Sequence, residues 1–288
     1  MRARLCVAAA LSLVFASRGE GQSEGPRDVR TALTRISEYV QDYYSRAQSL
    51  IGTERVVVQP LSRSFGLDGF SRTFMNELRL EWLPREDGEP AVATMLRKRM
   101  TVNGRVPKPK DTPECTDPLS EQVEPLSMFL PEFGGEYDFV WKGERTEKEG
   151  RVMLLEFRER PAGPATSEWR EVKGEDCVMV SLPGAHAGRV WADPTTGAVS
   201  RLEMHLKGPV DVRVPRNQQH KAGQYVTVER SDYAIRYRPV TFQDPDETLL
   251  LPASIDVVRT YRNALMSSRV TQAYTNYRRF LGSGRIVE

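Results

Sequence analysis

The sequence has few of the residue types that build catalytic and metal sites. Its 288 residues include three cysteines and three histidines, and no Cys/His spacing matches a zinc site. It contains no glycine-rich phosphate loop, and no serine in the context of a hydrolase nucleophile. His186, His205 and His220 lie in polar strand or loop sequence, so we expect them to be exposed. We therefore expect no catalytic residue, no metal site and no cofactor.

A long apolar run is also missing after residue 21. Before that point, Arg2 and Arg4 precede an apolar run over 5–15 that is too short to span a bilayer, and small residues follow. This order predicts a cleaved signal peptide over 1–21, with a retained membrane anchor as the alternative. We expect 22–288 to form a single exported domain of the periplasm or extracellular space that is not an integral membrane protein.

The exported chain has almost no net charge. Removing residues 1–16 takes away Arg2 and Arg4, so the 41 basic residues become 39, which equals the 39 acidic residues. This balance argues against a nucleic-acid partner attracted by overall charge. Acidic residues recur at Asp244, Asp246 and Glu247, and the Asp-Pro-Asp run 244–246 predicts a charged loop rather than a metal site.

Two cysteines remain after the predicted signal peptide, Cys115 and Cys177. In an oxidising compartment these two residues are candidates for a disulfide that closes a long loop. The alternative is a pair of free thiols, and the spacing does not decide between them.

The first feature after the leader is an amphipathic pattern over 27–51. Apolar residues recur there at steps of three and four, which predicts one long helix that ends before Gly52. Such a helix packs on a sheet or lies on a membrane, and its mixed-charge polar face favours the sheet. The apolar stripe consists of Val29, Leu33, Ile36, Val40, Tyr43, Ala47 and Leu50.

Beyond the helix, the hydrophobic period changes to two, which predicts about ten β-strands in meander order. Long consecutive strands with short turns pair antiparallel. We therefore expect a mainly β (α+β) fold, a strongly curved antiparallel sheet or open β-barrel that holds the helix. The predicted strands are 54–59, 72–82, 91–102, 136–142, 151–160, the two arms of the hairpin 188–204, 224–237, 249–261 and 267–280.

Two segments of this pattern have a more specific interpretation. Residues 188–204 predict a β-hairpin, in which the Asp193 side chain bonds the backbone ahead of it and Gly197 takes a positive φ. Leu119–Phe133 predicts a short helical insert with an apolar face. This insert either plugs a cavity or closes one end of the core.

Three motifs resemble a family of secreted bacterial proteins without an established activity. They are 99–106 (RMTVNGRV), 188–203 (GRVWADPTTGAVSRLE) and 271–280 (TQAYTNYRRF). The architecture of this family is similar to that of LolA-like outer-membrane lipoprotein carriers and sorting proteins. The resemblance implies an open antiparallel β-barrel around one long helix, a fold that binds lipid in the known carriers.

From this resemblance and the apolar strand faces we expect a non-enzymatic periplasmic protein that binds or carries a lipid or another apolar small molecule. The alternative is an envelope module that binds a protein partner and has a filled core without a ligand. The candidate ligand-lining residues are Phe74, Leu78, Leu80, Trp82, Met128, Phe129 and Phe133.

Overall fold

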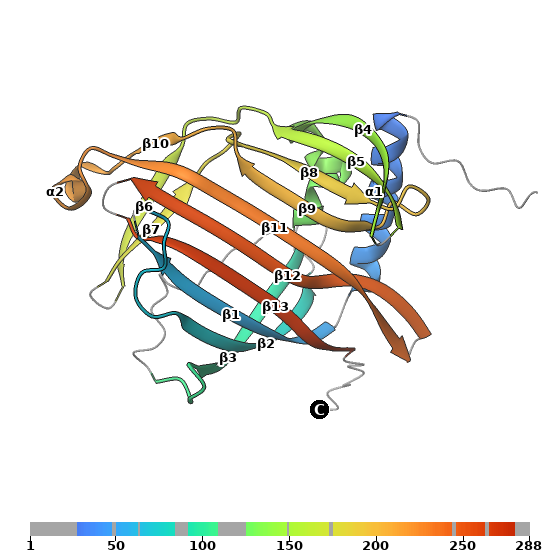
Figure 1. Ribbon diagram of the computed structural model, residues 1–288, viewed down its shortest axis with the longest axis horizontal. Helices are drawn as coiled ribbons and strands as arrows, with labels where there is room; N and C mark the ends of the chain where they lie inside the picture. Colours follow the sequence, from blue (N-terminus) through green and yellow to red (C-terminus); the bar gives the residue numbers. More distant parts are fainter. Residues whose placement is uncertain are drawn as a thin grey trace, which may run out of the picture.

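The described part of the chain is mainly β, with thirteen strands and one long helix (Figure 1). The computed structural model describes residues 28–47, 50–62, 64–83, 92–108, 125–148, 150–172, 175–243, 246–262 and 265–279.

Eleven strands form one sheet in which all neighbours are antiparallel. They are β1 (Leu50–Leu61), β2 (Arg72–Leu83), β3 (Val92–Val102), β4 (Tyr137–Glu147), β5 (Gly150–Glu159), β8 (His186–Ala192), β9 (Val199–Leu206), β10 (Val210–Arg213), β11 (Tyr225–Gln243), β12 (Asp246–Arg262) and β13 (Ser267–Arg279). Their order is β3-β2-β1-β13-β12-β11-β9-β8-β5-β4, with β10 beside β11. The sheet is strongly curved and does not close, so the predicted fold class is confirmed.

The strands that come first and last in the sequence, β1 and β13, lie side by side in the sheet. Strand β1 pairs with β13. In the described chain, the strand order begins at β3 and ends at β4, two strands that follow each other in the sequence. Strand β13 also pairs with β12. It is therefore an interior strand of the sheet.

Three short strands were not predicted. Strands β6 (Thr166–Val172) and β7 (Glu175–Ser181) form a separate hairpin, and β10 adds to β11. The sequence over 166–181 carries charges at close intervals, which hides the period of two. These strands lie at the end of the molecule that also carries the four-residue helix α2 (Gln219–Ala222) (Figure 1).

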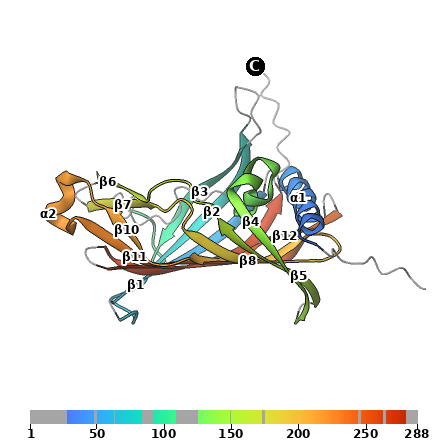
Figure 2. The same cartoon turned by 90° about the horizontal axis from the view of Figure 1, so that it is seen from above.

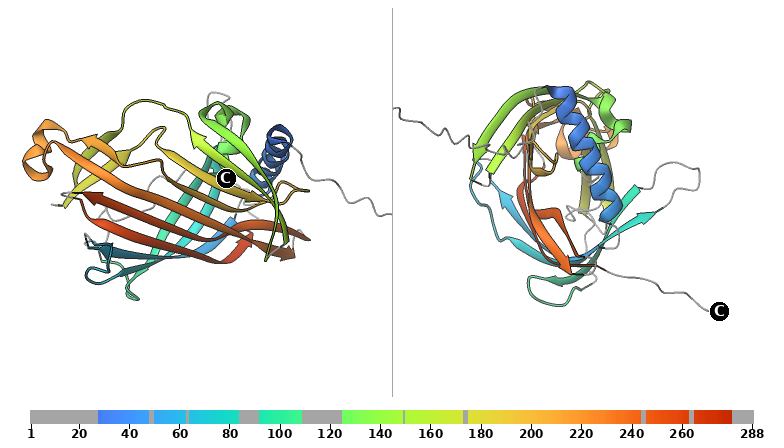
Figure 3. Two further views of the ribbon diagram at one scale, coloured as in Figure 1. Left: turned by 45° about the horizontal axis from the view of Figure 1, so that its top comes forward. Right: turned by 90° about the vertical axis from the view of Figure 1, so that its right-hand side faces the viewer.

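The long helix α1 (Val29–Arg46) lies on the concave side of the sheet, near one end of it (Figures 2 and 3). Asp28 caps it by accepting a hydrogen bond from the Thr31 amide at 2.9 Å. Its sheet-facing residues are buried, which confirms the predicted apolar stripe over most of its length. The predicted end of the helix is wrong, because Leu50 already belongs to β1, where it pairs with Leu80 and Arg279.

The β8–β9 hairpin forms as its turn residues predict. The Asp193 carboxylate accepts hydrogen bonds from the amides of Thr195 and Thr196 at 2.8 and 2.7 Å, and Gly197 has a φ of 76°. The turn also contacts α1, because Arg35 donates a hydrogen bond to the Pro194 carbonyl.

Part of the predicted helical insert is present as two short 3₁₀ helices, η3 (Pro125–Phe129) and η4 (Pro131–Glu136), and its residues 119–124 lie outside the described residues. Leu126, Met128 and Phe129 are buried in the same core cluster as α1. Helix η3 therefore packs against α1 at one end of the core, and η4 packs against η3. The two short helices are called the helical insert below. Within the described ranges, no helix combines the length and hydropathy that a membrane span needs.

Substituting Gly197 by alanine is expected to destabilise the fold strongly. A Cβ atom there would lie 2.9 Å from the Ile36 nitrogen and closer still to the Arg35 carbonyl. The positive φ alone costs roughly 1–3 kcal/mol, and the clash with the helix backbone adds to that cost. Urea unfolding measures the loss.

The matched control is Gly104→Ala. Gly104 has nearly the same φ of 77°, but a Cβ there meets nothing within 4 Å. The free energy of unfolding should therefore fall less than in Gly197→Ala. Equal losses in the two variants would contradict close packing between the hairpin turn and α1.

Candidate functional site

The concave face of the sheet around α1 is a packed apolar core. Ile36 and Val40 of α1 are fully buried, and they share one core cluster with Phe74 of β2 and Ile235 of β11. The same cluster contains residues of the helical insert and of β13. The sheet interior next to α1 is therefore filled by side chains.

A groove of about 330 Å³ lies between α1 and the helical insert. One wall is apolar and comes from the insert and β4, and the other carries polar side chains of α1. Its volume lies near the lower end of the range of ligand pockets, roughly 300–1,000 Å³. The lining residues are Leu33, Thr34, Ser37, Glu38, Gln41, Met128, Phe129, Leu130, Pro131, Gly134 and Phe139.

Aromatic rings support the apolar wall of the groove. The rings of Phe129 and Phe139 lie 5.6 Å apart, and Phe139 also contacts Tyr137 and Phe157 at 6.1 Å. Burial raises the pKa of Tyr137 to about 12, so its hydroxyl stays uncharged even in strongly alkaline solution. The wall thus presents an uncharged, closely packed surface to the groove.

The predicted lining residues divide into three groups. Met128 and Phe129 line the groove, whereas Phe133 is half-buried in η4 and is absent from the lining. Phe74 and Leu78 are buried in the core. Leu80 and Trp82 belong to β2, but their side chains lie outside the described residues.

None of the three histidines lines the groove. Cys115 and the Cys177 side chain lie outside the described residues, so their disulfide stays a prediction. His205 and His220 are exposed, but His186 is partly buried, and its backbone and ring nitrogens lie 3.0 and 3.1 Å from the Glu159 carboxylate. Within the described ranges, no group of three His, Cys, Asp or Glu side chains is placed to hold a metal ion.

The Glu159 carboxylate holds His186 in place. Burial tends to raise the pKa of Glu159, but the hydrogen bonds from the His186 side chain and amide outweigh burial and lower it below its usual value. Glu159 thus stays ionised at neutral pH and fixes the His186 ring.

A buried polar cluster lies on the concave face of β1, β2 and β3. Glu54 is completely buried and accepts a hydrogen bond from Asn76 at 2.8 Å. Arg97, whose side chain is 9% exposed, reaches the same carboxylate at 3.1 Å. Arg99 donates to the Asn76 side-chain oxygen at 3.2 Å.

Two further groups extend this polar cluster. The guanidinium groups of Arg99 and Arg72 lie 4.2 and 5.2 Å from the centre of the Phe74 ring. On β13, the Tyr274 hydroxyl donates to the Gln272 side-chain oxygen at 2.9 Å. Burial, with a smaller contribution from the Glu54 carboxylate, raises the pKa of Tyr274 well above its usual value.

Sequence reasoning missed this cluster, although a signal was present. Strand register pairs Glu54 with Asn76 and Tyr274, and Asn76 with Arg99. Asn76 lies between Phe74 and Leu78, both predicted to face inward, so the period of two already places it on the concave face. What the sequence could not supply was the pairing of β1 with β13.

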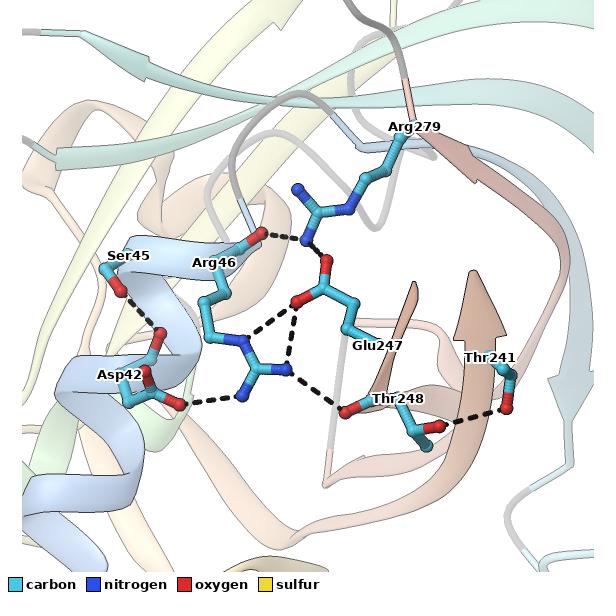
Figure 4. A network of polar contacts seen from close by, with 7 residues as sticks. All are labelled: Asp42, Ser45, Arg46, Thr241, Glu247, Thr248 and Arg279. Carbon is cyan, nitrogen blue, oxygen red and sulfur yellow. Dashed lines mark hydrogen bonds and ion pairs between the residues drawn. The ribbon is translucent and has the colours of Figure 1, made fainter. Parts of the chain in front are cut away.

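An ion network holds the C-terminal end of α1 to the sheet (Figure 4). Arg46 lies between Asp42 and Glu247, with nitrogen–oxygen distances of 2.9 Å to both carboxylates. Arg279 of β13 pairs with Glu247 and donates to the Arg46 carbonyl at 2.7 Å. The Glu247 side chain is only 12% exposed, so this carboxylate is largely shielded from water. Of the predicted charged loop 244–246, residues 244 and 245 lie outside the described residues.

One loop outside the groove exposes large apolar side chains. Phe65, Leu67 and Phe70 of the β1–β2 loop are 54, 77 and 96% exposed. The loop backbone is nevertheless ordered by hydrogen bonds between Ser62 and Gly66 and between Phe65 and Ser62. Phe65 has a φ of 63°, an uncommon conformation for an aromatic residue.

No protein-family model and no curated protein matches the chain. Several solved structures are similar to it. A LolA superfamily protein from Nitrosomonas europaea has 10% sequence identity and a TM-score of 0.36, with 89% of this chain and 97% of that chain covered. A DUF1329 family protein from Desulfovibrio piger has 12% identity and a TM-score of 0.40, with 89% and 95% covered.

A third similar structure is a domain described as an outer membrane lipoprotein-sorting protein, from Vibrio parahaemolyticus. Its identity is 11% and its TM-score 0.38, with 87% of this chain and 94% of that chain covered. In fold, the chain is similar to LolA superfamily proteins. This is the fold that the three sequence motifs predict. At such identities and TM-scores the likeness concerns the fold alone, so any function rests on this chain's own residues.

Replacing Glu247 by glutamine is expected to loosen α1 from the sheet. The change removes the carboxylate that Arg46 and Arg279 share, at a cost of roughly 1.5–3 kcal/mol, as for hydrogen bonds to charged groups. Urea unfolding measures the stability, and hydrogen exchange of the α1 amides reports the local loosening.

The matched control is Glu229→Gln, which breaks the pair with Arg262, a side chain that is 65% exposed. An exposed pair contributes at most about 1 kcal/mol. If the two variants lost equal stability, and equal protection of the α1 amides from hydrogen exchange, the ion network around Glu247 would not be what anchors the helix.

Proposed function

We propose that the protein is a non-enzymatic carrier or binding protein of the periplasm that takes a lipid or another apolar small molecule into the groove between α1 and the helical insert. The observation that carries the proposal is the groove itself. In this groove, an apolar wall with aromatic side chains lies opposite the amphipathic helix α1.

The energetics of such a ligand need no charged group in the groove. Each methylene removed from water contributes about 0.8 kcal/mol, so about ten methylenes contribute about 8 kcal/mol. The loss of translational and rotational freedom on binding offsets at least about 4 kcal/mol of this free energy. A single acyl chain in the groove is therefore expected to bind reversibly, as a carrier requires.

Export is part of the proposal. The basic, apolar and small-residue order of 1–21 supports a signal peptide, and the core cluster that joins α1 to β13 supports one domain after it. An oxidising compartment would also allow Cys115 and Cys177 to pair.

Filling the groove tests this function. Gly134 lines the groove, and a Cβ atom there meets nothing within 4 Å. Gly134→Phe is therefore expected to fold normally and to lower the affinity for the fluorescent apolar probe N-phenyl-1-naphthylamine at least about tenfold, equal to 1.4 kcal/mol. Fluorescence titration measures the affinity.

Gly135→Phe is the matched control. Its Cβ also meets nothing within 4 Å, but Gly135 does not line the groove. This variant should bind the probe as the original protein does. Absence of saturable probe binding in the original protein, or equal binding by the two variants, would overturn the assignment of the groove.

A second candidate function is an envelope module that binds a protein partner. The filled core next to α1 and the ordered β1–β2 loop with its exposed Phe65, Leu67 and Phe70 support it. Such a loop offers apolar anchors at little cost in ordering, as binding hot spots do.

A photo-crosslinking amino acid at position 70 tests this second function in cells. One discrete adduct is expected from position 70 and none from position 140, where Val140 is an apolar residue that is 56% exposed on β4. The adduct should disappear when Leu67 is replaced by serine. Adducts at both positions, or at neither, would contradict a partner site on the loop.

A further inference from the structure

We infer that the groove between α1 and the helical insert takes an amphiphile with a positively charged ammonium headgroup, and that Glu38 of α1 selects this charge. This inference rests on the proposed carrier function and names its ligand class. The apolar chain supplies most of the affinity, and the charge of the headgroup decides which ligands are taken.

The first argument is the charge inside the groove. Of the described residues that line it, Glu38 is the only one with an ionisable side chain. Glu38 lies on the exposed side of α1, and within the described chain its carboxylate takes part in no hydrogen bond or ion pair. A cation that enters the groove can therefore pair with this carboxylate without displacing a partner from it.

The second argument is that the insert carries the same sign of charge. The described part of the insert, 125–136, contains Glu132 and Glu136 but no lysine or arginine. A cleft in which charges of one sign lie between apolar walls concentrates their field on a ligand. The groove therefore attracts a cation and repels an anion.

The arginines that flank the groove face other groups. Arg30 interacts electrostatically with the Asp28 carboxylate at the start of α1. Arg35 donates a hydrogen bond to the β8–β9 turn. Arg160, beside the insert, pairs with Asp138 at 2.7 Å. None of the three lines the groove, so the described lining offers no positive charge to an anionic headgroup.

The third argument is the aromatic side of the groove. Phe139 lines the apolar wall and is only half-buried, so part of its ring is accessible to a ligand. The face of an aromatic ring attracts a cation through its quadrupole, and aromatic rings bind quaternary ammonium groups in this way. The groove thus combines a carboxylate on one wall with an aromatic ring on the other, and both favour an ammonium group.

The hydrogen-bond donors of the polar wall are largely used inside the helix. The Thr34 hydroxyl donates to the Arg30 carbonyl at 3.1 Å, and the Gln41 side-chain nitrogen donates to the Ser37 hydroxyl at 3.2 Å. An anionic headgroup loses hydrogen bonds to water when it binds, and this wall returns few of them. An ammonium group meets oxygen acceptors there instead.

Three ligands that share one saturated chain test the inference: dodecylammonium with a positive charge, monolaurin with a neutral headgroup and dodecanoate with a negative charge. Each is used below its micellar concentration to displace N-phenyl-1-naphthylamine from the protein. Dodecylammonium is expected to displace the probe at concentrations at least about tenfold lower than dodecanoate, equal to 1.4 kcal/mol. Monolaurin should lie between them.

A fourth ligand identifies the source of the ammonium group. Lauroyl lysophosphatidylethanolamine carries an ammonium next to a phosphate. If it displaces the probe as well as dodecylammonium does, the ligand class includes phospholipids. If it displaces the probe less well, the ligand class is that of simple amines.

Variants at position 38 then locate the preference. Glu38→Gln should remove the difference between dodecylammonium and dodecanoate, and Glu38→Lys should reverse it. Both variants are expected to fold, because the position is exposed and glutamine and lysine are good helix formers. Circular dichroism and urea midpoints check the folding.

Asp68→Asn is the matched control. It removes one negative charge from the exposed β1–β2 loop, which does not line the groove. This variant should keep the preference of the original protein for dodecylammonium. If it lost the preference as Glu38→Gln does, overall charge and not Glu38 would select the ligand, and the inference would be wrong.

The outcomes separate the two proposals. If the three ligands bind equally well, or dodecanoate binds best, the ammonium site is overturned and the carrier function stands. If none displaces the probe, the carrier function fails and the ammonium site with it. If the preference persists in both variants of position 38, the role of Glu38 is overturned.

Discussion

The structure depends on the burial of one helix stripe against a curved sheet. Ala32, Ile36 and Val40 of α1 are fully buried, and their burial is what orders the concave side of the sheet. The helix is held at two places: near its middle by the β8–β9 turn, where Gly197 meets its backbone, and at its C-terminal end by the ion network around Glu247. The groove exists only because α1 is fixed there while its polar side stays uncovered.

Much of this fold could be predicted from the sequence because it follows from local patterns. Periodicity located α1 and most strands, and the residues Asp193 to Gly197 specified a turn that forms as expected. The apolar face of the insert located Met128 and Phe129, which lie in the wall of the groove, and their role in lining a ligand stays a prediction. Where charges broke the alternation, as in β6 and β7, the pattern failed.

The remainder depends on contacts between residues far apart in the chain. Nothing in the sequence around Glu247 indicates that Arg46 and Arg279 are its partners. The motif at 271–280 was predicted to lie in a strand, but the sequence did not place that strand, β13, between β1 and β12, where Tyr277 donates to the Pro252 carbonyl. The polar cluster is likewise a product of strand register, which periodicity does not determine.

The adjacency of β1 and β13 has a consequence for the order of folding. Contacts such as that between Thr53 and Asn276 join residues 223 positions apart. The chain loses the entropy of closing so large a loop before the contact can stabilise the fold. Hairpins such as β8–β9 can form early because their strands are adjacent in the sequence. The centre of the sheet forms only after β1 and β13, from the two ends of the domain, have paired. The helix, whose anchor Arg279 lies on β13, thus acquires its fixed place late, after a slow and cooperative assembly.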